Sequence, residues 1–208
     1  MPVKNIILDL GGVIINLDIP ATVNEFNRIS AIPFEDLYTQ FQQVELFNLF
    51  DKGLISDFDF FTRVKELIRH QGEDEELLRA WNAMLLDVPA GRLELLVKLK
   101  QKYNTFLLSN TNETHIESFE RDLYLRHGVK NFNDYFDEVY YSCRTGLRKP
   151  DKEIFEMVLS KNKLDPAETI FIDDSVQHVQ GAGQCGIRAY LLPKGMELEK
   201  LVKELHLL

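Results

Sequence analysis

The sequence predicts an α/β protein with a doubly wound, open parallel sheet and an inserted block of helices. Two observations favour this fold class. Short, continuous apolar runs, each ending in polar residues, alternate with segments of helical periodicity. One long stretch, from about residue 20 to residue 86, contains no convincing strand. The chain of 208 residues is long enough for one core domain and a smaller helical one.

The predicted strands are rich in β-branched, aromatic and leucine residues. Their apolar character is continuous rather than alternating, which is typical of strands buried on both faces of a parallel sheet. A Gly11-Gly12 turn follows the first of them closely. Five segments are predicted to be strands, and the third of them has the weakest signal: 4–9, 105–108, 138–142, 169–172 and 188–192.

Helical patterns separate these strands at 92–100 and 154–159, and a third closes the chain at 197–205. The closing helix repeats apolar residues at i, i+3, i+4 and i+7, which places them on one face. Alternation of strands and helices indicates a doubly wound core. We assign residues 1–17 and 88–208 to this core.

Residues 18–87 are predicted to form a helical cap inserted after the first strand. Helices are expected at 22–29, 34–41, 58–68 and 75–86. Eight of the 14 phenylalanines lie in this block, and packing of its own small core is the favoured explanation for them. The segments 16–20 and 87–91 are the expected hinges, and cap closure over a site would exclude water.

Composition narrows the function. The formal net charge of −9 argues against a nucleic-acid partner, whose phosphates require a basic surface. No apolar run is long enough to span a bilayer, and the N-terminus lacks a signal-peptide pattern, so we expect a cytoplasmic protein without a membrane partner. A small phosphate ester remains compatible, because a site can be locally positive within an acidic protein. The sequence does not indicate the oligomeric state.

Polar residues stand where the predicted strands end. Asp9, Ser109, Asp173 and Asp174 follow or close three of them, and the carboxyl ends of parallel strands are where ligands bind in open α/β sheets. Carboxylates gathered at one point raise each other's pKa unless a cation neutralises them. Oxygen ligands of this kind favour Mg²⁺, which takes one or two protein carboxylates together with water and substrate phosphate.

These motifs, in this order, resemble those of haloacid dehalogenase (HAD) superfamily hydrolases with a helical cap. The four matching segments cover nearly the whole chain: Asp9-Leu10-Gly11-Gly12-Val13, Leu107-Leu108-Ser109-Asn110, Gly146-Leu147-Arg148-Lys149-Pro150 and Ile170-Phe171-Ile172-Asp173-Asp174. Within the superfamily, residues 9–14, 109–112 and 146–150 resemble the subgroup of α-D-glucose-1-phosphate phosphatases.

The resemblance implies a Mg²⁺-dependent phosphatase that hydrolyses a small phosphorylated metabolite, a sugar phosphate above all. Asp9 would be the nucleophile and form an aspartyl-phosphate. Ser109, Asn110 and Lys149 would bind the phosphoryl group, and Lys149 would also restrain Asp9. The metal ligands would be Asp9, the carbonyl of Gly11, Asp174, and Asp173 either directly or through water.

One departure from the family pattern concerns the leaving group. Phosphatases of this family usually carry an acid–base aspartate two residues after the nucleophile, and here that position is Gly11. General acid–base catalysis typically contributes about 10²–10⁴-fold in rate. Water or a substrate hydroxyl relaying the proton is the favoured explanation, and it suits a sugar 1-phosphate. Asp18 is a second candidate acid, although a helix-capping role is favoured for it.

A non-catalytic role is the alternative function. In that case the chain is a degenerate HAD protein that binds phosphorylated ligands without turning them over. His178 lies four residues after Asp174, and it is expected either to touch a metal-bound water or to be an ordinary helix histidine.

Overall fold

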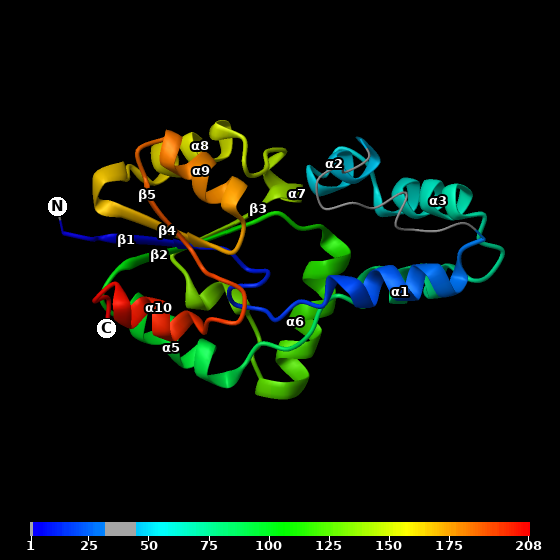
Figure 1. The fold of residues 1–208 in the computed structure, drawn as a ribbon, viewed down its shortest axis with the longest axis horizontal. Coiled ribbons are helices and arrows are strands. Elements are labelled where there is room, and N and C mark those ends of the chain that lie inside the picture. The colour runs from blue at the N-terminus through cyan, green and yellow to red at the C-terminus, as the bar shows by residue number, and fades with distance from the viewer. Residues whose placement is uncertain (1, 32–44) are drawn as a thin grey trace.

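A five-stranded parallel sheet forms the centre of the molecule in a computed structural model, which describes residues 2–31 and 45–208 (Figure 1). The strand order is β3-β2-β1-β4-β5, with every neighbouring pair parallel. The strands are β1 Asn5–Leu8, β2 Asn104–Ser109, β3 Glu138–Tyr141, β4 Thr169–Asp173 and β5 Arg188–Leu191. The predicted fold class and all five predicted strands are therefore confirmed.

Successive residues of each central strand supply opposite faces of the sheet. Ile6 and Leu8 of β1 pack into one apolar cluster, whereas Ile7 between them packs into the other. Leu107 of β2 follows the first pattern, and its neighbours Phe106 and Leu108 follow the second. This division explains the continuous apolar runs in the sequence, because a strand covered on both sides has no solvent face.

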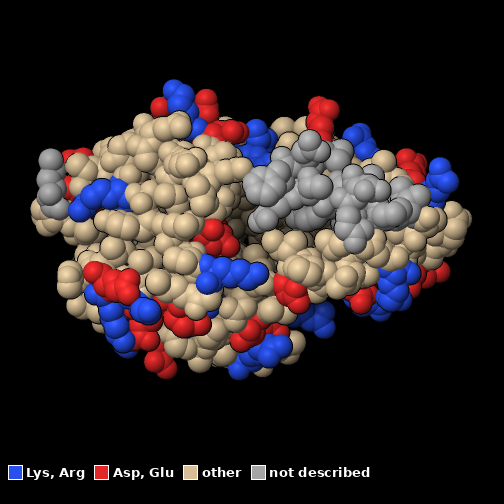
Figure 2. Space-filling view, in the orientation of Figure 1, with Lys and Arg blue, Asp and Glu red and all other residues tan. Residues whose placement is uncertain are grey.

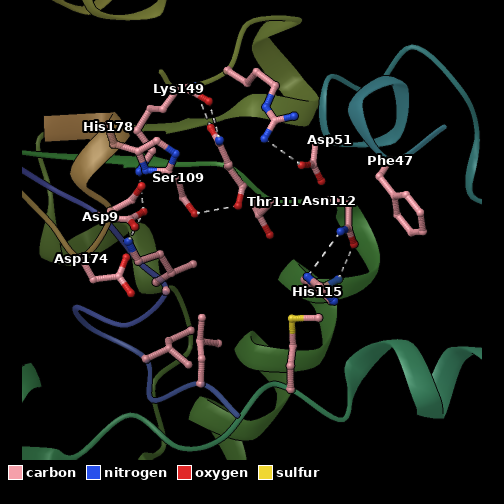
Figure 3. A pocket seen from close by; sticks show the side chains of 18 of the residues that line it. Asp9, Phe47, Asp51, Ser109, Thr111, Asn112, His115, Lys149, Asp174 and His178 are labelled. Carbon is pink, nitrogen blue, oxygen red and sulfur yellow. Dashed lines mark hydrogen bonds and ion pairs between the residues drawn. The ribbon is translucent and has the colours of Figure 1, made fainter. Parts of the chain in front are cut away.

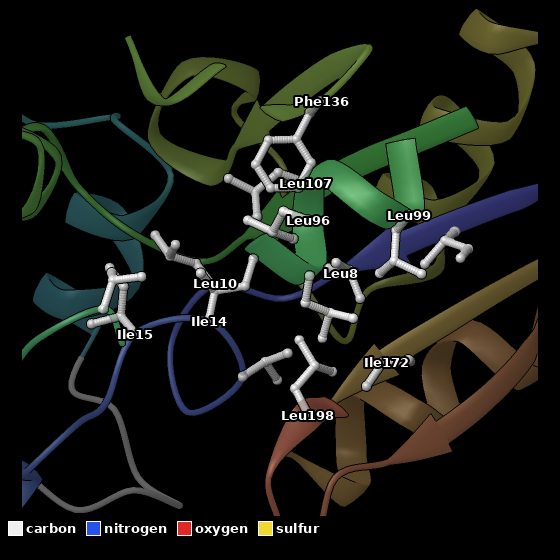
Figure 4. Packing of buried hydrophobic residues seen from close by; sticks show 14 of the residues in the cluster. Leu8, Leu10, Ile14, Ile15, Leu96, Leu99, Leu107, Phe136, Ile172 and Leu198 are labelled. Carbon is white, nitrogen blue, oxygen red and sulfur yellow. The ribbon is translucent and has the colours of Figure 1, made fainter. Parts of the chain in front are cut away.

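Helices cover both faces of the sheet (Figure 1). One face carries α5 Ala90–Lys100, α6 Glu113–His127 and α10 Leu198–Glu204, which enclose the larger cluster around Leu8, Leu107 and Ile172 (Figure 4). The other carries α8 Lys152–Asn162 and α9 Val176–Gln184. The short helix α7 Ser142–Thr145 and the 3₁₀ turns Phe132–Tyr135 and Pro166–Glu168 complete the connections.

Within the described residues, four helices lie beyond the carboxyl ends of the strands and share a core of their own (Figure 1). They are α1 Ile19–Ile29, α2 Glu45–Asp51, α3 Asp57–Ile68 and α4 Asp74–Asn82. Phe26, Phe47, Phe50 and Phe60 surround Trp81, and the rings of Phe50 and Phe60 stack 3.8 Å apart. Packing therefore accounts for most of the described phenylalanines, but Phe58 is an exception, since it is 77% exposed. The helix predicted at 34–41 lies outside the described residues.

Local signals start and stop these helices. Asp18 caps α1 by accepting a hydrogen bond from the Ala21 amide, as favoured for it from the sequence, and Ser56 caps α3 in the same way. The helix predicted to run to residue 86 ends instead at Asn82. Just beyond, the Thr22 hydroxyl accepts from the amide of Met84 and redirects the chain.

The two segments that join the four helices to the sheet run side by side. Asn16 and Asp87 are linked twice, by a backbone bond of 3.0 Å and a side-chain bond of 3.1 Å, and a bridge pairs Leu17 with Leu85. The domain division at 17/18 and 87/88 remains a prediction. Within the described ranges no helix is long and apolar enough to cross a membrane.

Charged side chains of both signs are intermingled over the face in Figure 2.

Candidate active site

The carboxyl edge of the sheet carries the candidate active site (Figure 3). Asp9 directly follows β1, Ser109 ends β2 and Asp173 ends β4. Because β1 lies between β2 and β4, the three side chains are placed next to one another although up to 164 residues separate Asp9 from Asp173 in the chain. The strand order thus gathers what the sequence keeps apart.

Lys149 joins two of these carboxylates. Its Nζ lies 2.7 Å from Oδ1 of Asp9 and 2.6 Å from Oδ2 of Asp173, and neither Lys149 nor Asp173 is exposed to solvent. Burial works against a charged lysine, but the charges of Asp173 and Asp9 raise the pKa of Lys149 above its ordinary value. The ammonium group is therefore held in the charged form between its two partners.

The two acids respond differently to this position. Burial and the neighbouring charge of Asp173 raise the pKa of Asp9 well above its ordinary value, although Lys149 opposes the rise. The pKa of Asp173 is lowered despite its burial, since it pairs with Lys149 and with His178. The charge of Lys149 thus compensates the two carboxylates only in part, and the pKa that rises is that of Asp9.

The Asp9 carboxylate has two distinct oxygens. Oδ1 accepts hydrogen bonds from the Leu10 amide at 2.7 Å and from Lys149. Oδ2 accepts none from the residues that the structure describes. The carboxylate is therefore fixed in orientation through one oxygen while the other is left for chemistry.

Asn110 fixes the backbone of Lys149. Its Oδ1 accepts from the Lys149 amide at 2.9 Å, and its Nδ2 donates to the Lys149 carbonyl at 2.8 Å. Each end of the Asn110 side chain thereby bonds the Lys149 backbone, and Nδ2 carries a second N–H besides the one that it donates to the Lys149 carbonyl. Ser109 is almost fully buried, with its hydroxyl 3.5 Å from the Asn110 carbonyl oxygen.

Asp174 lines the cavity and stands apart from the Lys149 cluster (Figure 3). Although its side chain is open to the cavity, the surrounding protein and the charge of Asp173 raise its pKa to about 6. The Gly11-Gly12 turn packs against it: Gly12 has φ of +70°, and a Cβ there would lie 2.7 Å from Cγ of Asp174. Two cavity-side carboxylates with raised pKa values are a fitting environment for a hard cation.

His178 completes the back of this cluster. Its Nδ1 lies 3.0 Å from Oδ1 of Asp173, which also accepts from the Ser175 amide at 2.8 Å. One ligand atom each from Asp9, Asp173 and His178 lies within 4.8 Å of the others. Asp173 nevertheless turns both oxygens to protein partners, so its geometry resembles that of a group orienting Lys149.

A cavity of about 580 Å³ opens in front of these residues, between the sheet edge and the helices α2 and α4. Of the residues predicted for the site, all but Asp173 line it: Asp9, Gly11, Ser109, Asn110, Lys149 and Asp174. Gly11 has an apolar neighbour, because a Cβ at this position would lie 2.8 Å from Cδ1 of Leu17. Asp18 is outside the cavity wall, where it caps α1.

The far wall of the cavity contains a polar network that the sequence motifs did not predict (Figure 3). Asn112 caps α6 by accepting from the His115 amide, and it also accepts from the Trp81 indole at 3.4 Å. The His115 ring stacks on Trp81 with centroids 5.1 Å apart. Burial lowers the pKa of His115 to about 4, so the ring is neutral at pH 7. The one available signal in the sequence was an asparagine, a favoured N-cap residue, just before a helix.

The arrangement of fold and site has counterparts among known proteins. The sequence model of the haloacid dehalogenase-like hydrolase family matches residues 3–186, and the chain belongs to this family of enzymes. The superfamily membership expected from the motifs is thus confirmed.

Particular relatives define the neighbourhood more closely. D-ribitol-5-phosphate phosphatase of Bacteroides thetaiotaomicron is 27% identical over 94% of both chains. A HAD family enzyme of the same organism, in a crystal structure with magnesium and inorganic phosphate, is 34% identical, covers 96% of this chain and 98% of its own, and superposes with a TM-score of 0.90. A predicted HAD-like hydrolase from Porphyromonas gingivalis, 27% identical, covers 99% of this chain and 98% of its own with a TM-score of 0.87.

Proposed function

We propose that the protein is a Mg²⁺-dependent phosphatase that hydrolyses a small, hydroxylated phosphate ester through an aspartyl-phosphate on Asp9. The observation that carries the proposal is the buried Lys149 bridge, which orients Asp9 through Oδ1, while Oδ2 accepts no hydrogen bond from the part of the chain that the structure describes. The similarity to D-ribitol-5-phosphate phosphatase and to a structure with magnesium and phosphate supports it.

The residues present fit a magnesium ion. Asp9 and Asp174 present two carboxyl groups to the cavity, and burial first and the charge of Asp173 second raise the pKa of each. A cation bound between them would favour their charged forms. We propose that these two acids and the Gly11 carbonyl hold the ion, with Asp173 behind them. Bound there, Mg²⁺ would offset the repulsion between the Asp9 carboxylate and an anionic phosphate.

The first chemical step follows from the positions of the side chains. Oδ2 of Asp9 attacks phosphorus, and the bond to the leaving alkoxide breaks as the aspartyl-phosphate forms. Lys149, the Ser109 hydroxyl and the Asn110 amide would stabilise the charge on the transferred oxygens. Water then attacks the aspartyl-phosphate, releasing phosphate and restoring Asp9.

The proton for the leaving group has no obvious protein donor at Gly11. The neighbouring Leu17 side chain makes that side of the cavity apolar. We therefore propose that water or a substrate hydroxyl relays the proton, which favours substrates with a nearby hydroxyl or a weakly basic leaving oxygen. D-Ribitol 5-phosphate meets the first condition, and α-D-glucose 1-phosphate, the substrate of the subgroup that the motifs resemble, meets the second. The cavity of about 580 Å³ is of a size that suits either.

A substrate panel with a nucleophile variant tests this function. We expect phosphate release from at least one sugar or sugar-alcohol phosphate to require Mg²⁺, and Asp9→Asn to lower kcat on the order of 10³-fold or more. The matched control is Asp122→Asn, because Asp122 is an aspartate in a surface pair with Arg126, and it should retain activity. Binding of phosphorylated ligands without turnover at any Mg²⁺ concentration would instead support the degenerate binding protein.

A further inference from the structure

The C-terminal end of α2 and the two residues after it contact the core at three points. The contacts fall on the segment 148–151 and on Cys143, which lies shortly before it. Arg148 donates through Nη1 to the Asn48 side chain, and its Nη2 lies 3.7 Å from the Asp51 carboxylate. Lys52 pairs with Asp151 at 3.3 Å. Each contact joins the helical block to the core across more than 90 residues of chain, since their sequence separations are 100 and 99.

The third point is a close approach of two backbones. Gly53 follows α2 with φ of +64°, and a Cβ there would overlap the Cys143 carbonyl oxygen and lie 2.9 Å from its carbon. Cys143 belongs to α7, the short helix before the segment that carries Lys149. Only a residue without a side chain allows α2 to approach the core so closely.

These contacts converge on the catalytic segment. Arg148 and Asp151 flank Lys149-Pro150, so the same helix holds the chain on both sides of the lysine. That segment is itself rigidly attached, because Asn110 bonds both the amide and the carbonyl of Lys149. It is therefore an anchor against which α2 can be placed.

Of the two ion pairs, the one between Arg148 and Asp51 stabilises the position of α2 more. Its side chain is 16% exposed and that of Asp51 is 13% exposed, so this pair is shielded from water on both sides. The Lys52–Asp151 pair is 29% and 47% exposed and contributes less. Phe47, Asn48 and Asp51 line the cavity. The contacts with Arg148 hold this end of α2, and Phe47 and Asp51 lie across from Asp9 (Figure 3).

We propose that Arg148, Asp151 and the close approach of Gly53 to Cys143 together seat α2 on the core beside Lys149 and so complete the substrate cavity. Arg148 and Asp151 are then positioning residues. The proposal rests on the proposed phosphatase function for its kinetic test alone. Binding energy between the substrate and the α2 side of the cavity is available only when α2 is seated. Unseating α2 therefore lowers the fraction of binding-competent protein and raises KM in proportion, while Asp9 and Lys149 keep their chemistry.

Gly53→Ala tests the proposal with a single methyl group. The control is Gly128→Ala, because Gly128 has a similar φ of +67° but nothing within 4 Å of a Cβ. Both variants bear the backbone strain, and only Gly53→Ala pushes α2 from Cys143. We expect Gly53→Ala to raise KM about five-fold or more with kcat changed less than about three-fold, and Gly128→Ala to change neither by more than about two-fold. Equal kinetics of the two variants would overturn the proposal.

A second measurement does not depend on turnover. Hydrogen exchange of the α2 amides should slow in the wild type on addition of Mg²⁺ with inorganic phosphate, and it should remain faster in Gly53→Ala than in Gly128→Ala. If the wild type lacks phosphatase activity, the proposed function fails, whereas the exchange result still decides the seating of α2. Exchange rates that are the same in both variants count against it.

A charge exchange covers the case in which Gly53→Ala does not fold. Lys52→Asp and Asp151→Lys each place like charges together, and the double variant restores an ion pair of reversed polarity. We expect α2 exchange to be faster in each single variant and to return toward the wild-type rate in the double variant. Additive effects, with no recovery in the double variant, would refute the contribution of this pair.

Discussion

Replacing Lys149 by methionine should be among the most destabilising single changes that this protein can undergo. The substitution removes the one cation between Asp9 and Asp173 while keeping the volume of the aliphatic stem. Nζ lies 2.7 Å and 2.6 Å from the two carboxylates, and the Lys149 side chain has no exposed surface. Removing one partner of a buried ion pair costs about 3–5 kcal/mol, because the remaining charge is buried without compensation.

The expected cost can be measured as a melting temperature. For a chain of this size each kcal/mol corresponds to about 2–4 °C, so Lys149→Met should lower Tm by about 6–20 °C without metal at neutral pH. The control is Lys152→Met, since Lys152 forms an exposed pair with Glu156 at 3.5 Å that contributes little. Circular dichroism melts of the two variants and the wild type give the comparison directly.

The pH dependence supplies an independent check. Without the lysine, burial still raises the pKa values of Asp9 and Asp173 while the charge of Lys149, which lowers both, is gone, so the folded variant binds more protons than the folded wild type. Its stability is then highest at low pH and is lost as pH rises through the folded-state pKa values. The gap to the wild type should widen from pH 5 to pH 8. A Tm loss no greater than that of Lys152→Met, or a gap that narrows with pH, would refute the electrostatic reasoning.

Two further predictions concern the rest of the cavity. Gly12→Ala should weaken Mg²⁺ binding about ten-fold or more in calorimetry, because its Cβ would overlap the Asp174 carboxylate. The control is Gly195→Ala, which should leave Mg²⁺ binding unchanged, because Gly195 has a φ of +83° and nothing within 4 Å of a Cβ. His115→Gln should make stability less dependent on pH. The folded-state pKa of His115 is about 4 against about 6.5 when unfolded, so the wild type loses stability as pH falls through this window, by about 3 kcal/mol in full. Urea titrations between pH 4 and pH 7 that show the same slope for wild type and variant would contradict the assignment.

The sheet was predictable because its central strands are apolar along their whole length. β1, β2 and β4 are buried on both faces, so their apolar residues run without interruption and the polar residue after each run stands out. The strand ends then follow, and with them the neighbourhood of Asp9, Ser109 and Asp173. The strand ends need only the local pattern, whereas their neighbourhood also uses the rule that parallel strands end at one edge of the sheet.

Several helices gave no comparable signal. The longest, α6, buries Thr114 and His115 in its first turn, and these polar residues obscure the apolar stripe. In α9, Gly181 and Gly183 lower the helix propensity. Gly181 is explained only by the structure, where its Cα faces the carbonyl of Pro150. Such contacts arise between distant segments and leave no local pattern.

Side-chain direction was the least predictable aspect of the site. The motif places Asp173 and Asp174 at one strand end, but consecutive residues point to different sides, so one meets Lys149 and the other lines the cavity. Likewise, the Asn110 side chain bonds the amide and the carbonyl of Lys149, contacts that the motif did not predict. The network of Asn112, His115 and Trp81 depends on the packing of α4 against α6, which no single segment encodes.

The central place of β1 in the sheet has a consequence for synthesis on the ribosome. β1 is made first, yet it pairs on one side with β2, about 100 residues later, and on the other with β4, about 164 residues later, as the partners of Asn5 are Asn104 and Thr169. Its apolar side chains therefore remain without their final neighbours until most of the chain has emerged. The four helices that follow β1 in the sequence can meanwhile assemble around their own aromatic core. The cluster of Asp9, Lys149 and Asp173 thus forms late, when β4 enters the sheet and brings Asp173 to Lys149.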